Sequence, residues 1–233
     1  MNLHFKSAPA LIVAIMLIGL GFASQSNATI VLNTTHHDCV QPGCQSVGFQ
    51  SNDGSTVVGD TNPAPIYNVY VDSLVSGVSL HGNGSNVNNS AGNGSGFSSF
   101  LIRPESGWGW STIDFQLDSL YKDQPIDIGG LSFTAKDQFN NYFSMSANFP
   151  WEGDKGENQH YRIDGLDGQL ITSLQVDYID PLGMGNLISD MHNIDVKSAQ
   201  VPSVPVPPSL GLLMSGLAGL GVLGRAKSKK HAV

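Results

Sequence analysis

The sequence predicts an all-β protein: a single antiparallel β-sandwich, of jelly-roll type, between an N-terminal signal peptide and a C-terminal transmembrane helix. Three observations lead to this prediction. Apolar residues recur with a period of two through the middle of the chain, and pairs of Gly, Pro, Asn and Asp interrupt that alternation. Short apolar runs also stand near both ends of the 233 residues. We place the sandwich domain at residues 29–197.

Strands are expected where apolar and polar residues alternate, because successive side chains of a strand point to opposite faces of its sheet. Tyr67, Val69 and Val71 form the first such set. Turn-forming pairs such as Asn62-Pro63 and Asp167-Gly168 separate the strands, and no amphipathic stretch is long enough for a substantial helix. This pattern favours packed antiparallel sheets. The other alternating segments are residues 112–117, 131–135, 143–149 and 170–178.

Residues 82–96 are almost entirely Gly, Asn and Ser. Such a segment buries too little apolar area to offset the entropy of ordering it, so we expect a mobile loop. A calcium-binding nonapeptide repeat is the alternative, but that repeat needs aspartates and this segment has none.

The N-terminus has the three parts of a secretory signal peptide. Lys6 provides a positive charge, residues 10–23 form an apolar run, and Ser26-Asn27-Ala28 places small residues where signal peptidase cuts. We expect residues 1–28 to be removed, which leaves Thr29 as the first residue of an exported protein. A retained N-terminal anchor is the alternative.

The C-terminus combines a Pro-rich linker at residues 198–208, an apolar segment at residues 209–224 and a basic tail at residues 225–233. As a helix, the apolar segment spans about 24 Å at 1.5 Å per residue, which is short for a hydrocarbon core of about 30 Å. The basic tail is expected to stay cytoplasmic. Its cations are Arg225, Lys227, Lys229 and Lys230, and the linker ends in the motif Val204, Pro205, Val206, Pro207, Pro208 and Ser209.

This C-terminal arrangement resembles the PEP-CTERM sorting signal of Gram-negative bacteria that make exopolysaccharide. Val206 departs from the family pattern, which usually has Glu there. The resemblance implies processing by an exosortase-type membrane enzyme, transient anchoring in the inner membrane, and then a place on the cell surface or in the extracellular matrix. An ordinary membrane anchor that is never cut is the alternative. The same type of tail is also catalogued on ice-binding proteins, but no regular Thr-x-Thr array is present.

Charge narrows the choice of partners. Residues 29–203 contain all nineteen acidic residues of the chain and six basic ones, a net charge of −13. A surface of this sign repels nucleic acid and anionic lipid, so neither is an expected partner.

The two cysteines, Cys39 and Cys44, flank a Pro-Gly turn. In an exported protein such a pair forms a disulfide. The alternative is a zinc site that uses both thiolates and one of the neighbouring His36 and His37.

Trp108 and Trp110 are the candidate ligand-binding residues. They share the parity of Thr112 and Asp114, opposite to Ile113, so a regular strand would expose both indoles as a platform for sugar rings. The alternative is that Gly107 or Gly109 breaks the alternation and the tryptophans close the end of the sandwich.

No catalytic motif is present: neither Gly-x-Ser-x-Gly nor His-Glu-x-x-His, phosphate loop or dinucleotide fingerprint occurs. We expect no cofactor and no catalytic metal, although a structural calcium ion at the turn of Asp164 and Asp167 is an alternative. The sequence therefore predicts a non-enzymatic cell-envelope or extracellular-matrix protein associated with exopolysaccharide. A carbohydrate-binding module that uses Trp108 and Trp110 is the first alternative, and a secreted hydrolase is the second.

Overall fold

The computed structural model describes residues 29–34, 39, 42–91, 96–120, 129–149, 159–180, 183, 185 and 187–202. These residues form thirteen β-strands and contain no helix. The strands are β1 (Ile30–Asn33), β2 (Cys44–Gly54), β3 (Thr56–Asn62), β4 (Asn68–Ser73), β5 (Leu80–Gly84), β6 (Asn86–Asn89), β7 (Ser99–Pro104), β8 (Trp108–Ser119), β9 (Gly130–Asp137), β10 (Tyr142–Asn148), β11 (Gln159–Gly165), β12 (Ile171–Ile179) and β13 (Ile188–Gln200).

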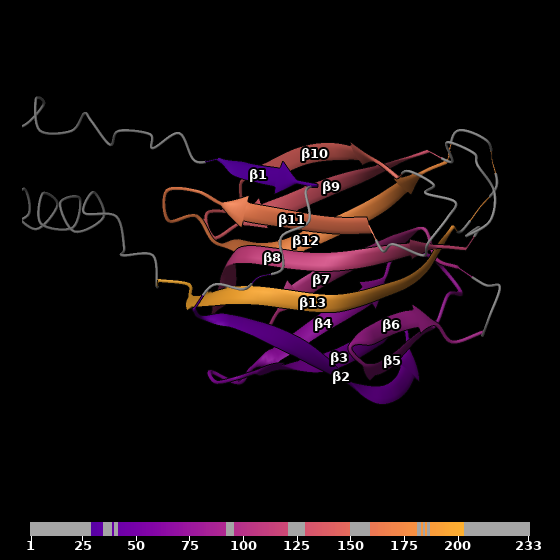
Figure 1. Ribbon diagram of the computed structural model, residues 1–233, viewed down its shortest axis with the longest axis horizontal. Helices are drawn as coiled ribbons and strands as arrows, with labels where there is room; N and C mark the ends of the chain where they lie inside the picture. The colour runs from indigo at the N-terminus through magenta and orange to yellow at the C-terminus, as the bar shows by residue number, and fades with distance from the viewer. Residues whose placement is uncertain are drawn as a thin grey trace, which may run out of the picture.

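The strands form one antiparallel sheet in the order β1-β11-β8-β13-β6-β5-β2-β3-β4-β7-β12-β9-β10 (Figure 1). A further contact between β8 and β12, through the pair Trp110 and Ile171, closes nine of the strands into a ring. The prediction of an all-β antiparallel fold is confirmed.

Two wings extend beyond the ring. Strands β11 and β1 continue the sheet from β8, and β9 and β10 continue it from β12. An aromatic cluster lies between the wings: the ring of Phe133 lies 5.2 Å from that of Tyr161 and 6.3 Å from that of Phe115, between centroids. All three side chains are buried, so the wings are held together by a shared apolar core.

The predicted alternation is confirmed most clearly in β4 and β9. Val69 and Val71 of β4 and Phe133 of β9 are fully buried, and the residues between them are partly exposed. Strand β10 also alternates, but Met145 on its inner side is only half-buried. The reason is that β10 is the last strand of its wing and has a neighbour on one side only within the described residues.

The expectation of a loop at residues 82–96 is wrong for its first half. Residues 80–89 form the hairpin of β5 and β6, which pairs with β2 on one side and with β13 on the other. Leu80 and Val87 are fully buried and anchor it. Gly82 lets the hairpin lie against β2, since an added Cβ would stand 3.0 Å from the carbonyl oxygen of Gln50. Backbone pairing thus orders a segment that has few apolar side chains of its own.

Figure 1 shows that β1 begins and β13 ends at the same end of the molecule. The pairing agrees, because Ile30 lies opposite Gly165 while Gln200 lies opposite Trp108, the first residue of β8. The described residues therefore end, at Pro202, on the side where the first strand starts.

Candidate functional site

One outer sheet face is unusually polar and unusually buried. We call it the polar face: the side chains of Thr112, Asp114, Gln116 and Asp118 from β8, of His160, Arg162 and Asp164 from β11, and of Asp190, His192 and Asp195 from β13. In an antiparallel sheet with one face on the core, the other face normally meets water. Here Asp114 is 2% exposed and Gln116 is 8% exposed.

The polar face contains two pairs of carboxylates on neighbouring strands. Asp195 lies opposite Asp114, and Asp190 lies opposite Asp118. Like charges in directly opposed positions destabilise a sheet unless other groups compensate them. None of the four side chains is without an interaction partner.

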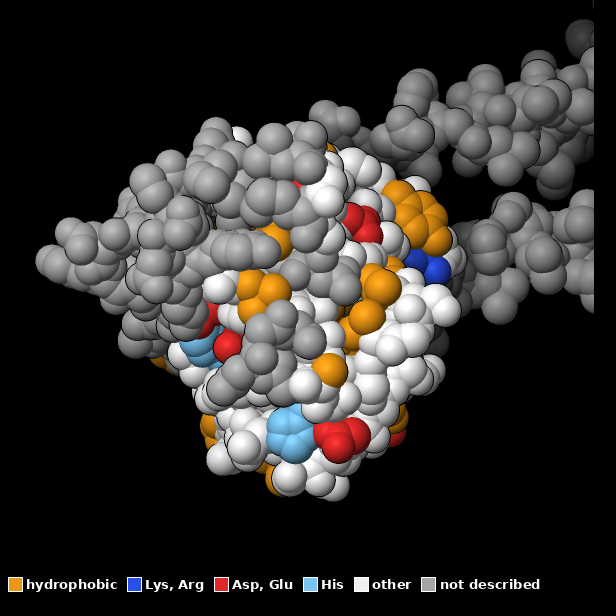
Figure 2. Space-filling view, turned by 90° about the vertical axis from the view of Figure 1, so that its right-hand side faces the viewer, with side chains coloured by type: hydrophobic (Ala, Val, Ile, Leu, Met, Phe, Trp, Pro, Cys, Tyr) orange, Lys and Arg blue, Asp and Glu red, His pale blue; other side chains and the backbone are white. Residues whose placement is uncertain are grey.

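A histidine accompanies each pair. Nδ1 of His160 lies 3.9 Å from Oδ1 of Asp114, and Nε2 of His192 lies 3.3 Å from Oδ1 of Asp118. A protonated imidazole in either position would offset part of the carboxylate repulsion. A histidine also lies beside a carboxylate away from the polar face, since Nδ1 of His81 lies 2.5 Å from Oδ1 of Asp53. Figure 2 shows histidine side chains next to acidic ones on one end of the molecule.

Hydrogen bonds fix the rest of the polar face. The hydroxyl of Ser46 donates to Asp195 at 2.6 Å, and the hydroxyl of Thr112 donates to Asp164 at 2.8 Å. Nε of Arg162 donates to both oxygens of Asp164 at 3.0 Å. These carboxylates are therefore engaged with protein groups.

The alternative calcium site at Asp164 and Asp167 does not assemble. Asp164 is held by Arg162, while Asp167 adopts a left-handed conformation, φ 55°, in the turn between β11 and β12. Within the described residues, no group of three or more His, Cys, Asp or Glu side chains is placed to hold a metal ion.

The exposed tryptophan platform is not formed, and this prediction is corrected. Trp110 is fully buried, and its indole Nε1 donates to the hydroxyl of Tyr67 at 2.9 Å. The register of β8 against β13 explains why. Lys197 pairs with Thr112, but the next residue of β13, Ser198, pairs with Trp110. Ser111 is therefore an extra residue in β8, a β-bulge, and it turns Trp110 inward.

Trp108 follows Trp110 toward the inside. It is half-buried, packs against the core and stacks on Tyr67 with ring centroids 4.7 Å apart. The alternative, that the tryptophans close one end of the fold, describes the structure. Gly109 permits this closure, because an added Cβ would lie 2.9 Å from Cβ of Leu170.

The predicted disulfide is confirmed. Cys39 and Cys44 are bonded, with their Cα atoms 5.8 Å apart. Both thiols of the alternative zinc site are thereby used, and His36 and His37 lie outside the described residues. The bond joins residue 39 to the first residue of β2.

The sorting residues cannot be placed, since residues 1–28 and 203–233 lie outside the described part of the chain. The signal peptide, the sorting motif, the transmembrane helix at residues 209–224 and the basic tail are all among them. The described residues include no helix with the length and apolar character needed to cross a bilayer.

Comparison with known proteins adds no assignment. No protein-family model matches the chain, and no curated protein matches it. The polar face itself was missed from the sequence, although its signal was present: Thr112, Asp114, Gln116 and Asp118 form the polar half of one alternating strand. Nothing in that alternation distinguishes a buried polar face from a solvated one.

Proposed function

We propose that this protein is an exported, non-enzymatic component of the cell envelope or extracellular matrix. Residues 204–209 act as a PEP-CTERM-like signal for an exosortase-type enzyme, and the released domain associates with exopolysaccharide. Its strands form a flattened sandwich of jelly-roll type, and the described residues begin and end, at Thr29 and Pro202, on one side of it. The single observation that carries the proposal is the bond between Cys39 and Cys44, since structural disulfides persist in oxidising compartments outside the cytoplasm.

Two further features support export and sorting. The described chain ends at Pro202, two residues before the sorting motif in the sequence, and Figure 1 shows that this end lies at one end of the fold. The net charge of −13 between residues 29 and 203 favours solubility outside the cell and disfavours nucleic acid.

Mass spectrometry of the protein from the envelope and from the medium tests this proposal. We expect a mature N-terminus at Thr29 and a C-terminus that lacks the basic tail. Pro205→Ala combined with Pro207→Ala should accumulate a membrane-bound precursor, because the motif loses its fixed extended shape. Pro202→Ala, outside the motif, is the matched control and should be processed normally.

The basic tail has a separate role in the proposal. Replacing Arg225, Lys227, Lys229 and Lys230 with Gln should let the tail pass through the membrane and release an unprocessed chain. A wild-type C-terminus that always ends at Val233 would show that no sorting enzyme cuts this protein.

The carbohydrate-binding alternative loses its platform because Trp110 is buried. Among the described residues, the candidate location for the hydrolase alternative is the carboxylate pairs of the polar face. Asp114 and Asp118 stand four residues apart on one strand, about 13 Å, which exceeds the separation that either glycosidase mechanism uses. Within each cross-strand pair the carboxylates stand directly opposite each other, but one of the two is buried, the other is half-buried, and both are engaged with other groups. A panel of glycan and ester substrates tests this alternative directly.

A further inference from the structure

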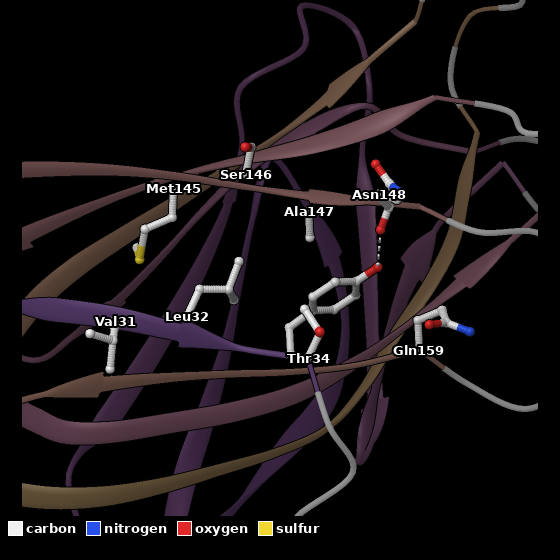
Figure 3. A pocket seen from close by; sticks show the side chains of 9 residues that line it. Val31, Leu32, Thr34, Met145, Ser146, Ala147, Asn148 and Gln159 are labelled. Atoms are coloured by element: carbon white, nitrogen blue, oxygen red, sulfur yellow. Dashed lines mark hydrogen bonds between the residues drawn. The ribbon is translucent and has the colours of Figure 1, made fainter.

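The two wings end in strands whose outer edges face one another. Among the described residues, no strand pairs with the outer edge of β1 or with that of β10. A groove of about 620 Å³ lies between these edges, and we call it the seam (Figure 3). It is large enough for a small ligand or a few residues of extended chain. Its lining includes Val31 and Leu32 of β1, Met145, Ser146 and Ala147 of β10, and Tyr161 of β11.

Strand direction defines what would complete the sheet. Figure 1 shows the arrows of β1 and β10 pointing the same way. If β1 and β10 paired directly, they would form a parallel ladder in an otherwise antiparallel sheet. One inserted strand, antiparallel to both, continues the pattern on each side.

The main-chain groups needed for such pairing point into the seam. The amide of Phe149 and the carbonyl of Asn141 form hydrogen bonds on the side of β9. Along a strand, the N–H and C=O groups of successive residues point to alternate sides. Ser144 and Ser146, at even-numbered positions, therefore direct theirs away from β9 and into the seam. The carbonyl of Asn148 shares this parity and accepts the hydroxyl of Tyr161 at 3.5 Å across the seam, as Figure 3 shows.

Strand β1 offers the matching edge. The carbonyl of Thr29 accepts the amide of Leu166 from the turn that follows β11. Residues of the other parity, Ile30 and Leu32, therefore direct their N–H and C=O groups toward the seam. An inserted strand would find donors and acceptors on both sides.

The side chains select an uncharged occupant. Among the described residues that line the groove, none is Asp, Glu, Lys or Arg, in a domain whose net charge is −13. Its inner side carries the apolar Leu32, Met145 and Ala147, which all pack against the core. Strand β10 also lacks the Lys, Pro or bulge with which natural proteins protect free edges.

We propose that the seam binds one extended, uncharged segment of another polypeptide, inserted antiparallel to β1 and β10. Alternate side chains of this segment lie on the apolar floor, and its backbone pairs with both edges, as in strand addition to a sheet. Strands β1 and β10 approach to within 8 Å between Cα atoms. A strand between them needs about 9.6 Å, twice the usual spacing, so binding opens the wings slightly.

Hydrogen exchange on the full-length protein tests the proposal with a defined probe, the capped peptide Thr-Val-Thr-Val-Thr-Val. The expected result is at least tenfold slower exchange at Ser144 and Ser146 when the peptide is present, with a measurable dissociation constant by fluorescence anisotropy. A peptide with proline in place of each threonine lacks half of the amide donors, and it should bind at least tenfold more weakly.

Ser146→Pro removes one edge donor without removing a bond to β9, and it should weaken binding of the Thr-Val peptide at least tenfold. Ser146→Thr keeps the amide and is the matched control, expected to bind within about twofold of the wild-type protein. Both variants should keep the wild-type far-UV circular dichroism. Unchanged exchange at Ser144 and Ser146 overturns the proposal. Binding of soluble polysaccharide in the seam, or dimerisation of the protein that Ser146→Pro abolishes, would assign the seam to another occupant and equally overturn it.

Discussion

Tyr67 shows how one buried polar atom organises its surroundings. Its hydroxyl accepts the indole N–H of Trp110 and bonds to the hydroxyl of Ser198, and its ring stacks on Trp108. Burial away from water raises the pKa of Tyr67 above its ordinary value of 10.0, more strongly than the hydrogen bonds to Ser198 and Trp110 lower it. The neutral phenol is therefore the form that the fold requires.

We predict a loss of stability in alkali that depends on this residue. Because the pKa is raised in the folded state, the full contribution of Tyr67 is present below about pH 10 and declines as the pH rises toward the folded-state pKa. Tyr67→Phe should reduce this alkaline loss. Thermal unfolding followed by circular dichroism between pH 8 and 11.5 measures it, and an unchanged slope in Tyr67→Phe would contradict the explanation.

Tyr161 provides the matched comparison. Burial raises its pKa as well, but its hydroxyl makes only a long contact, 3.5 Å, to the carbonyl of Asn148. Tyr67→Phe should cost about 1–3 kcal/mol at pH 7, because Trp110 and Ser198 lose a buried partner, while Tyr161→Phe should cost less.

At the scale of the element, the sequence predicts strands where burial alternates along a regular ladder. Strands β4 and β9 were foreseen for this reason. The bulge at Ser111 could not be foreseen, since one extra residue reverses the side of Trp110 without altering composition. The hairpin of β5 and β6 was missed because backbone pairing with β2 and β13, distant in sequence, orders it.

The turn between β11 and β12 allows a second prediction. An alanine Cβ at Gly165 would collide with the backbone carbonyl oxygen of Gln169, whereas a Cβ at Gly48 would meet no atom within 4 Å. Gly165→Ala should therefore destabilise the fold by about 1–3 kcal/mol. Gly48→Ala, the matched control in an exposed position of β2, should be neutral or stabilising by up to about 1 kcal/mol. Urea denaturation distinguishes them, and equal midpoints would contradict this assignment.

At the scale of the whole molecule, the disulfide contributes little to the ring itself. It joins two residues five positions apart beside the start of β2, outside the apolar core. In the chain-entropy model, so short a loop contributes about 2 kcal/mol. Its effect is to hold Cys39 beside the first residue of β2.

Cys39→Ser should accordingly leave the protein folded, with an unfolding free energy lower by no more than about 2 kcal/mol. Denaturation with and without reductant measures the difference, since reduced wild-type protein should match the variant. Two free thiols in unreduced protein isolated from the envelope would show that the bond does not form in the cell.

The central position of β13 has a consequence for the order of folding. This last strand pairs with β8 along most of its length and also with β2 and β6, and the bond from Ser46 to Asp195 joins residues 149 positions apart. Such distant pairings form slowly, because closing a long loop costs chain entropy before the new contacts can stabilise it. A chain that emerges N-terminus first therefore keeps the partner edges of β8 and β2 bare until residue 200 has appeared. The domain then acquires its cooperative core in one late step.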